Sequence, residues 1–185
     1  MNLRQATPDD WSLVRSIRLE ALQSDPSVFG SNYARESGYD EATWRRWSAH
    51  PDKAVFLLFD GEAVVGLTGV VTMSPDPGRA DGQGPTAVCV ASYLRPAYRG
   101  RKLSRWFYEA RIAWARAHGY HRIVTAHRLS NIASRQANQH FGFTEIQRVP
   151  HRWSDGVDEP EVVYELPLEP LRKISCVPGL NSGVE

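Results

Sequence analysis

The sequence predicts a single mixed α/β domain, with a central sheet of about six or seven strands and about four flanking helices. The chain has 185 residues, of which 42% are hydrophobic and 23% charged, and this ordinary globular mixture is long enough to bury one core. Short apolar, β-branched runs alternate with segments in which apolar residues recur every three or four positions, so strands and helices are interleaved. Clusters of Gly, Pro and Asp separate these segments and mark turns.

In the N-terminal half, two helices interrupt the strands. A strand is expected over 3–6, before a helix that Thr7 caps and that ends near residue 23. Asp40 can cap a second helix, which carries two tryptophans on a polar background. Residues 54–59 and 63–72 are apolar runs joined through Asp-Gly, which predicts a β-hairpin.

The second half alternates strand and helix until a final strand pair. The expected elements are, in order, a surface loop over 74–85, a strand over 86–94, a helix from Leu103 to Gly119, a strand over 122–127, a helix that Asn131 caps and Gly142 stops, and two strands over 143–149 and 161–166. Residues 1–166 therefore form the expected domain, and 167–185 are expected to be a polar, loosely packed tail.

Charge and composition exclude several classes of partner. The net charge is +1, so no overall field attracts nucleic acid or an anionic membrane. No apolar run is long enough to span a bilayer. The two cysteines, Cys89 and Cys176, imply no disulfide framework, and no signal peptide is evident, so a cytoplasmic location is expected.

One stretch combines the features of an anion site. The strand over 86–94 leads through Pro96 into Arg99-Gly100-Arg101-Lys102, and a helix follows. Free N–H groups at a helix start, the positive helix end and nearby arginines all favour a negative ligand. A phosphate or pyrophosphate is the expected ligand, although the cations alone could also be a solvated charge run.

The same stretch resembles the acyl-CoA-binding signature of GNAT-type N-acetyltransferases, Gln/Arg-x-x-Gly-x-Gly/Ala. Arg99 matches it, Ser104 is a small-residue variant, and Lys102 stands where the first glycine is usual. The segment from Asn131 to Phe143 is similar to the second signature of that family. There Asn138 occupies the position at which many members carry a tyrosine.

The resemblance implies a GNAT fold, with a mostly antiparallel sheet that splays near 90–94 and 122–127. It implies acetyl-CoA as co-substrate, an acyl carbonyl polarised by a backbone N–H near Tyr93 or Leu94, and N-terminal helices that line the acceptor site. The residues expected to bind the cofactor are Tyr93, Leu94, Arg99, Gly100, Arg101, Lys102, Leu103, Ser104, Asn131, Ser134 and Phe141.

Two residues near the expected acyl group are candidates for a catalytic role. His127 ends a strand near the expected acyl group and could act as general base, or it could simply be satisfied by its neighbours. Asn138 could donate a hydrogen bond to the leaving sulfur. No metal site is expected, because His118 and His121 straddle a helix end.

The leading functional hypothesis is acetyl transfer from acetyl-CoA to a primary amine of a small molecule or a protein, without nucleic-acid or membrane partners. One alternative is a CoA-binding regulatory or degenerate domain, which the departures at Lys102 and Asn138 keep open. Another is an acyltransferase that uses a different acyl-CoA or a hydroxyl acceptor. The sequence leaves monomer and homodimer both open.

Overall fold

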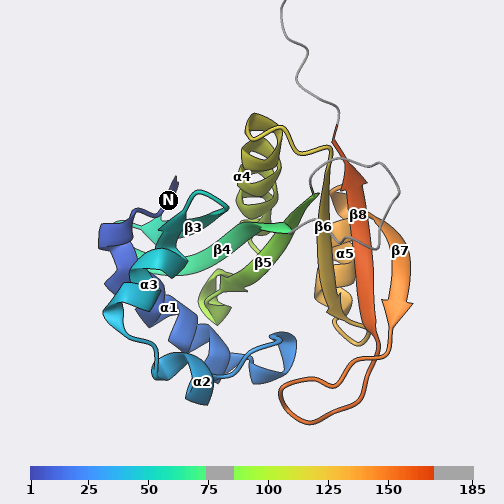
Figure 1. Cartoon of the computed structure of the whole chain (residues 1–185), viewed down its shortest axis with the longest axis horizontal. Coiled ribbons are helices and arrows are strands. Elements are labelled where there is room, and N and C mark those ends of the chain that lie inside the picture. The colour runs from blue at the N-terminus through green and yellow to red at the C-terminus, as the bar shows by residue number, and fades with distance from the viewer. Residues whose placement is uncertain (74–85, 169–185) are drawn as a thin grey trace, which may run out of the picture.

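The computed structural model describes residues 1–73 and 86–168, and within these ranges the chain forms one mixed sheet (Figure 1). Its order is β1-β3-β4-β5-β6-β8-β7, with β2 paired to β3 at one side. Every pairing is antiparallel except that of β5 with β6, as the resemblance implied. The strands are β1 (Asn2–Gln5), β2 (Ala49–His50), β3 (Lys53–Asp60), β4 (Ala63–Met73), β5 (Thr86–Leu94), β6 (Arg122–Arg128), β7 (Thr144–Val149) and β8 (Glu161–Pro167).

Helices cover both faces of the sheet. Successive side chains of a strand point to opposite faces, and β3 follows this rule. Val55 and Leu57 pack in the core that includes Ile17 and Trp44, whereas Phe56 packs in the core that includes Tyr108. The helices are α1 (Trp11–Ser24), α2 (Tyr33–Ser37), α3 (Glu41–Ser48), α4 (Ser104–Ala117) and α5 (Ile132–His140).

Local signals in the sequence explain most of these boundaries. Asp40 caps α3 by accepting a hydrogen bond from Thr43 N at 2.8 Å, and Asn131 caps α5. Gly61 takes a φ of +59° in the β3–β4 turn, a region that glycine adopts without a steric penalty. Near Thr7, a short 3₁₀ turn (Pro8–Asp10) precedes α1, so this helix begins slightly later than predicted.

Two short elements were not predicted, namely α2 and β2. The last strand, β8, extends one residue beyond the predicted 161–166, to Pro167, and Leu168 is buried in the core. The backbone N–H of Leu168 donates to the carbonyl of His121 at 2.8 Å. The predicted loop over 74–85 and the rest of the predicted tail lie outside the described residues.

The sheet is split between β5 and β6. These strands pair only over Thr86–Val88 and Arg122–Val124, and Figure 1 shows them diverging beyond that point. On its other side, β5 shifts register against β4 between Tyr93 and Val90, and Ala91 has a φ of +55°. The splay is therefore present, although the first three residues of β6 remain paired.

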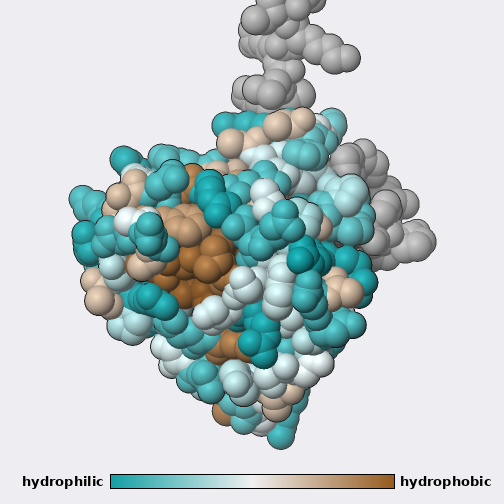
Figure 2. Space-filling view, turned by 90° about the vertical axis from the view of Figure 1, so that its left-hand side faces the viewer, coloured by the Kyte–Doolittle hydropathy of each residue, from teal (hydrophilic) through white to brown (hydrophobic). Residues whose placement is uncertain are grey.

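The surface on the side of the N-terminal elements is mostly hydrophilic. Figure 2 shows hydrophobic residues gathered mainly in one hollowed area of that face. Within the described part of the chain, no helix combines the length and apolarity needed to cross a membrane.

Candidate active site

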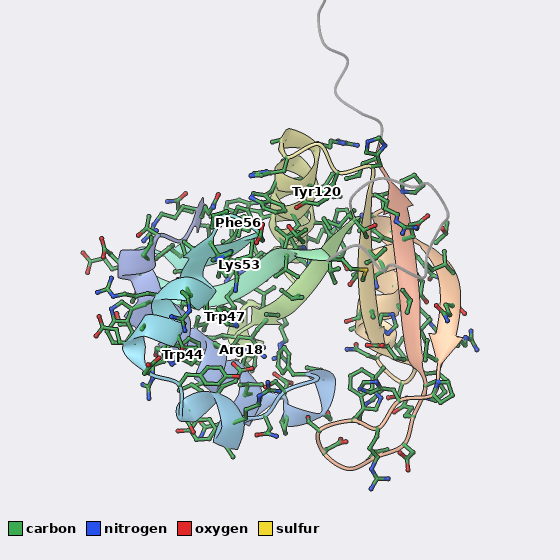
Figure 3. All side chains as sticks on the ribbon, in the orientation of Figure 1. Arg18, Trp44, Trp47, Lys53, Phe56 and Tyr120 are labelled. Carbon is green, nitrogen blue, oxygen red and sulfur yellow. The ribbon has the colours of Figure 1, made fainter. Side chains whose placement is uncertain are left out.

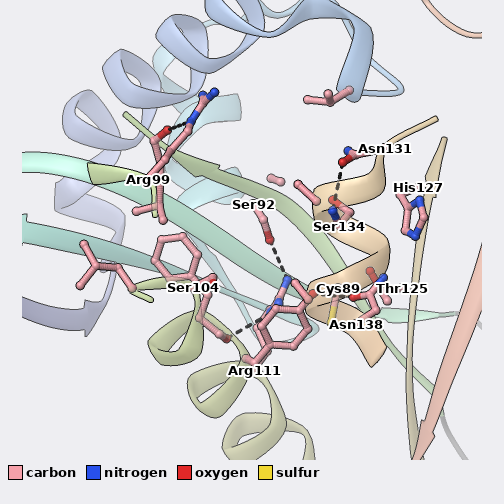
Figure 4. Close-up of a pocket in the computed structure, with 18 of the residues that line it drawn as sticks. Cys89, Ser92, Arg99, Ser104, Arg111, Thr125, His127, Asn131, Ser134 and Asn138 are labelled. Atoms are coloured by element: carbon pink, nitrogen blue, oxygen red, sulfur yellow. Dashed lines mark hydrogen bonds between the residues drawn. The ribbon is translucent and has the colours of Figure 1, made fainter. Parts of the chain in front are cut away.

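A first cavity, of about 350 Å³, opens at the split and lies between β5, the cationic turn, α4, α5 and β6 (Figure 4). It gathers most of the residues that the sequence analysis singled out, although they are spread over 45 positions between 94 and 138. The predicted site residues on its wall are Leu94, Arg99, Gly100, Lys102, Leu103, Ser104, His127, Asn131, Ser134 and Asn138.

The cationic turn has an unusual backbone conformation. Gly100 and Lys102 both have positive φ values, +73° and +58°, and Lys102 is one of two non-glycine residues in the described chain that do. The N-cap position of α4, Leu103, provides no side-chain hydrogen bond to the first turn. The N–H groups of Arg105 and Trp106 already donate to the carbonyls of Lys102 and Leu103, at 3.2 and 3.1 Å. The N–H groups of the turn that precedes them remain for another acceptor, so the turn can hold an anion.

Arg99 lines the first cavity but is already engaged. Its Nε donates to the carbonyl of Leu94 at 2.9 Å, and its Nη2 lies 2.5 Å from Oδ2 of Asp25 at the end of α1. The pair ties the cationic turn to the N-terminal helices. An anion in the turn would therefore share this guanidinium with a carboxylate.

Three predicted cofactor-binding residues do not line the first cavity. Tyr93 points toward α1, where its hydroxyl donates to Glu20 at 3.1 Å. The guanidinium of Arg101 lies over the ring of Tyr98, 5.2 Å from its centroid. Phe141 stacks on Tyr108 with ring centroids 4.2 Å apart.

Asn138 is buried, 1% exposed, and its side-chain oxygen accepts a hydrogen bond from the hydroxyl of Tyr108 on α4. Burial raises the pKa of this phenol to about 12, so the hydroxyl is protonated at neutral pH. The position that carries a tyrosine in the resembled family thus holds an amide here, in contact with a phenol from a different helix.

His127 is buried on the wall of the same cavity. Its Nδ1 lies 2.8 Å from the carbonyl of Arg128, which requires that nitrogen to carry the proton. Its Nε2 is buried and has no partner among the described residues. Burial is the main cause that lowers the pKa of this imidazole, so the neutral form, with a free lone pair on Nε2, is favoured.

A second cavity, of about 460 Å³, lies on the side of the N-terminal helices and is lined by charged and aromatic residues. Arg18 of α1 forms a two-pronged ion pair with Glu36, and its guanidinium lies 5.7 Å from the ring of Trp47. Figure 3 shows Arg18, Trp47 and Lys53 near one another. Burial lowers the pKa of Lys53, and the cavity wall also includes His151, Trp153 and Glu161.

The two cavities share part of their walls. The shared residues belong mainly to the irregular middle of β5 and the loop after α1: Val28, Phe29, Cys89, Val90, Ala91 and Ala126. A molecule in one cavity can therefore reach a molecule in the other at the split. Cys89 is a free, buried thiol whose pKa is raised by that burial, which disfavours its use as a nucleophile.

Sequence reasoning missed five polar residues on the wall of the first cavity: Ser92, Tyr98, Tyr108, Arg111 and Thr125. Tyr108 and Arg111 follow Ser104 by four and seven positions, which places all three on one face of a helix. From this spacing, the sequence could have indicated that Tyr108 and Arg111 lie on the same side of the helix as the predicted site residue Ser104. In residues 1–73 and 86–168, no group of three or more His, Cys, Asp or Glu side chains is arranged to hold a metal ion.

Comparison with known proteins gives a consistent result. Residues 17–143 match the model of the "Acetyltransferase (GNAT) family", whereas no curated protein matches the chain. Among solved structures, the chain is similar to ribosomal-protein-alanine N-acetyltransferase from Brucella melitensis, with 19% identity, a TM-score of 0.73, and coverage of 91% of this chain and 100% of that one. It is also similar to yncA from Salmonella typhimurium, solved with its cofactor acetyl-CoA, with 19% identity, a TM-score of 0.73, and coverage of 96% and 99%.

Proposed function

This chain belongs to the GNAT acetyltransferase family, and from that premise we propose that it transfers an acetyl group from acetyl-CoA to a primary amine of a small molecule or a protein. The observation that carries the proposal is the meeting of two cavities at the split between β5 and β6. One cavity has a cationic turn suited to a diphosphate, and the other has a charged and aromatic wall suited to an acceptor.

In the proposed complex, CoA occupies the first cavity. Its diphosphate lies against the turn from Arg99 to Ser104, where backbone N–H groups and the start of α4 favour negative charge. The pantetheine arm enters the split and pairs with strand edges that have no neighbour there, as in the addition of a strand to a sheet. Asn131 and Ser134, on the opposite wall, face the same arm.

Transfer takes place at the junction of the cavities. The unprotonated amine attacks the thioester carbonyl, a C–N bond forms, the C–S bond breaks, and the thiolate leaves on CoA. The irregular backbone around Ala91 and Ser92, which has no register partner on β4, supports polarisation of the carbonyl by a strand N–H.

His127 is proposed to accept the proton that the attacking amine loses. Its neutral state and its free Nε2 support a base role, directly or through a water. Glu161 on the wall of the second cavity is the competing base, because it lies on the acceptor side. Replacing each with its neutral analogue, His127→Gln and Glu161→Gln, and comparing the pH profiles of kcat/KM separates the two.

Asn138 is proposed to donate a hydrogen bond from its amide to the departing thiolate. Tyr108 holds the amide oxygen, which leaves the NH₂ group of the same side chain available. A cysteine-like thiol with a pKa near 8.5 is already a tolerable leaving group, so this donor has only to assist.

A thiol-release screen with acetyl-CoA tests the proposal. The amine panel contains polyamines, aminoglycosides, amino acids and peptide N-termini, and mass spectrometry of the acceptor confirms acetylation. Ser104→Asp places a negative charge at the phosphate turn and should weaken CoA binding at least tenfold by repulsion. Ser12→Asp, exposed on α1, is the matched control and should leave binding unchanged.

A CoA-binding domain without turnover is the second candidate, and the amide at position 138 favours it. CoA binding by calorimetry, with no thiol release from any amine, would support this second reading. Failure to bind CoA at all would contradict both.

A further inference from the structure

We propose that the acyl-CoA preferred by this protein carries a second, anionic carboxylate at the far end of its acyl group, as in malonyl- or succinyl-CoA, and that Arg111 binds this carboxylate. The inference rests on the proposed function, because it assumes that the first cavity holds an acyl-CoA. It keeps the transfer from an acyl-CoA to an amine and replaces acetyl as the preferred acyl group with one that ends in a carboxylate.

The first observation is a buried cation without a counter-ion. Arg111 lines the first cavity and is 3% exposed. Its Nη1 donates to Oγ of Ser92 at 2.7 Å, and its Nε donates to the carbonyl of Phe107 at 3.1 Å. Both acceptors are neutral, and in residues 1–73 and 86–168 no carboxylate forms an ion pair with this guanidinium.

The neighbours of Arg111 are arranged around a positive charge but do not neutralise it. Its guanidinium carbon lies 4.5 Å from the centroid of the Tyr108 ring, a cation–π contact. Ser92 is itself held by Thr68, with their hydroxyl oxygens 2.9 Å apart. Burying a charge is costly unless it is paired, so an anion that enters the cavity gains strongly from this site.

The position of Arg111 separates this anion from the diphosphate. Arg111 lies seven residues beyond Ser104, about 10 Å along α4, and Figure 4 shows it across the cavity from Arg99, beside Ser92 and Cys89. Cys89 belongs to the wall shared with the second cavity. The charge therefore lies close to the junction at which the acyl group reacts.

The carboxylate takes no part in the chemistry. The amine nitrogen bonds to the thioester carbonyl, the C–S bond breaks, and CoA leaves as the thiolate, as with acetyl-CoA. The carboxylate stays ionised against Arg111, and the product is an amide that ends in a carboxylate. The amine thus exchanges a positive charge for a negative one.

Affinities measured by calorimetry test the inference without knowledge of the acceptor. Succinyl-CoA is compared with pentanoyl-CoA, and malonyl-CoA with butyryl-CoA, because each neutral acyl chain matches the length of its charged counterpart. Wild-type protein should bind at least one charged donor about tenfold to a hundredfold more tightly than its neutral match, the range for a hydrogen bond to a charged group. Free CoA in the same titration reports on the first cavity as such.

Three variants decide the role of Arg111. Arg111→Met keeps the length of the side chain and should abolish the preference for the charged donor while free CoA still binds. Arg111→Lys keeps the charge and should retain part of the preference. Arg116→Met, exposed in the last turn of the same helix, should behave as wild type.

Equal affinity of wild-type protein for charged and neutral donors would overturn the inference, as would a preference that survives in Arg111→Met. Either result leaves the proposed function standing as long as free CoA binds. A protein that binds neither CoA nor any thioester would instead overturn the proposed function, and the inference with it.

Discussion

The two cavities that meet at the split each contain a buried arginine, and the protein treats these two charges differently. In the second cavity Arg18 is 6% exposed and forms two hydrogen bonds to the carboxylate of Glu36, at 2.7 and 2.9 Å. In the first cavity Arg111 is more deeply buried and has only neutral acceptors. The charge of Arg18 is therefore neutralised before a ligand arrives, and the charge of Arg111 is not.

A third buried arginine supports this contrast. Arg128 is 8% exposed and is held by Asp155 through two hydrogen bonds, at 2.8 and 2.9 Å. Among the described residues, the other two buried arginines, Arg18 and Arg128, are thus each paired with a carboxylate. The exception lies on the wall of the cavity that we assign to the acyl donor.

Breaking the pair in the second cavity should have the largest effect. Glu36→Gln keeps the shape of the side chain but leaves Arg18 as an unpaired buried charge, which should lower the free energy of unfolding by about 3–5 kcal/mol. Urea titration measures the loss. Glu41→Gln is the matched control, since its pair with Arg45 is exposed and contributes little to stability. Equal losses in the two variants would contradict the contrast.

The next effect concerns the cationic turn of the first cavity. Arg99→Ala should weaken CoA binding by about 1.5–3 kcal/mol, the value of a hydrogen bond to a charged group, as measured by calorimetry. Asp25→Asn removes the competing carboxylate and should leave binding unchanged or tighten it. If Asp25→Asn weakens binding as much as Arg99→Ala does, the arginine acts by holding the turn and not by binding phosphate.

Asn138 provides a smaller effect on turnover. Asn138→Ala should lower kcat by about tenfold or less, a loss near 1.4 kcal/mol, measured with an acceptor found in the screen. Tyr108→Phe removes only the hydroxyl that holds the amide and should give a loss no larger than this. A thousandfold loss in the alanine variant would show that the amide is essential.

Lys102 tests the backbone of the same turn. Its φ of +58° is unfavourable for a residue with a side chain, so Lys102→Gly should raise the free energy of unfolding by about 0.5–1 kcal/mol. CoA affinity should stay within about one order of magnitude, because a single exposed charge contributes roughly 1 kcal/mol. Arg101→Gly, next to it but outside the positive-φ region, should not stabilise. A large gain in CoA affinity in Lys102→Gly would mean that the lysine obstructs the site.

The smallest effect is a dependence of stability on pH. Burial lowers the pKa of His127 in the folded protein, so the unfolded chain takes up the proton first as the pH falls below about 6.5. The free energy of unfolding should therefore fall in that range, and His127→Gln should make the fall shallower. Urea titrations on both sides of this pH measure the slope, and exposed His140→Gln should leave it unchanged.

Much of the fold could be predicted because its signals are local. The bounds of β5 agree with the apolar run from Thr86 to Leu94, the hairpin turns at Gly61, and Asp40 and Asn131 cap the predicted helices. Each of these features depends on residues within a few positions of one another, which is the range over which sequence patterns are informative.

The site could be predicted only in part, because its remaining features join distant positions. Tyr108 and Asn138 are 30 residues apart, and Arg99 and Asp25 are 74 apart, so neither pair leaves a periodic signal. The backbone N–H near Tyr93 stays a predicted contact of the cofactor, but the strand pattern alone did not say that the side chain of Tyr93 faces α1. That Arg111 lacks a carboxylate can be known only once every neighbour is placed.

The short seam between β5 and β6 has a mechanical consequence. In the described part of the chain, three residues on each strand pair β5 with β6. The part of the sheet formed by β1–β5 is therefore hydrogen-bonded to the part formed by β6–β8 at one end only. The proposed CoA arm, by pairing with the strand edges in the split, would join the two parts of the sheet and would bind only to the folded arrangement of both. A ligand at one hundred times its Kd stabilises the folded state by about 2.7 kcal/mol. The free energy of unfolding of this protein would thus depend on the concentration of that ligand as well as on the chain itself.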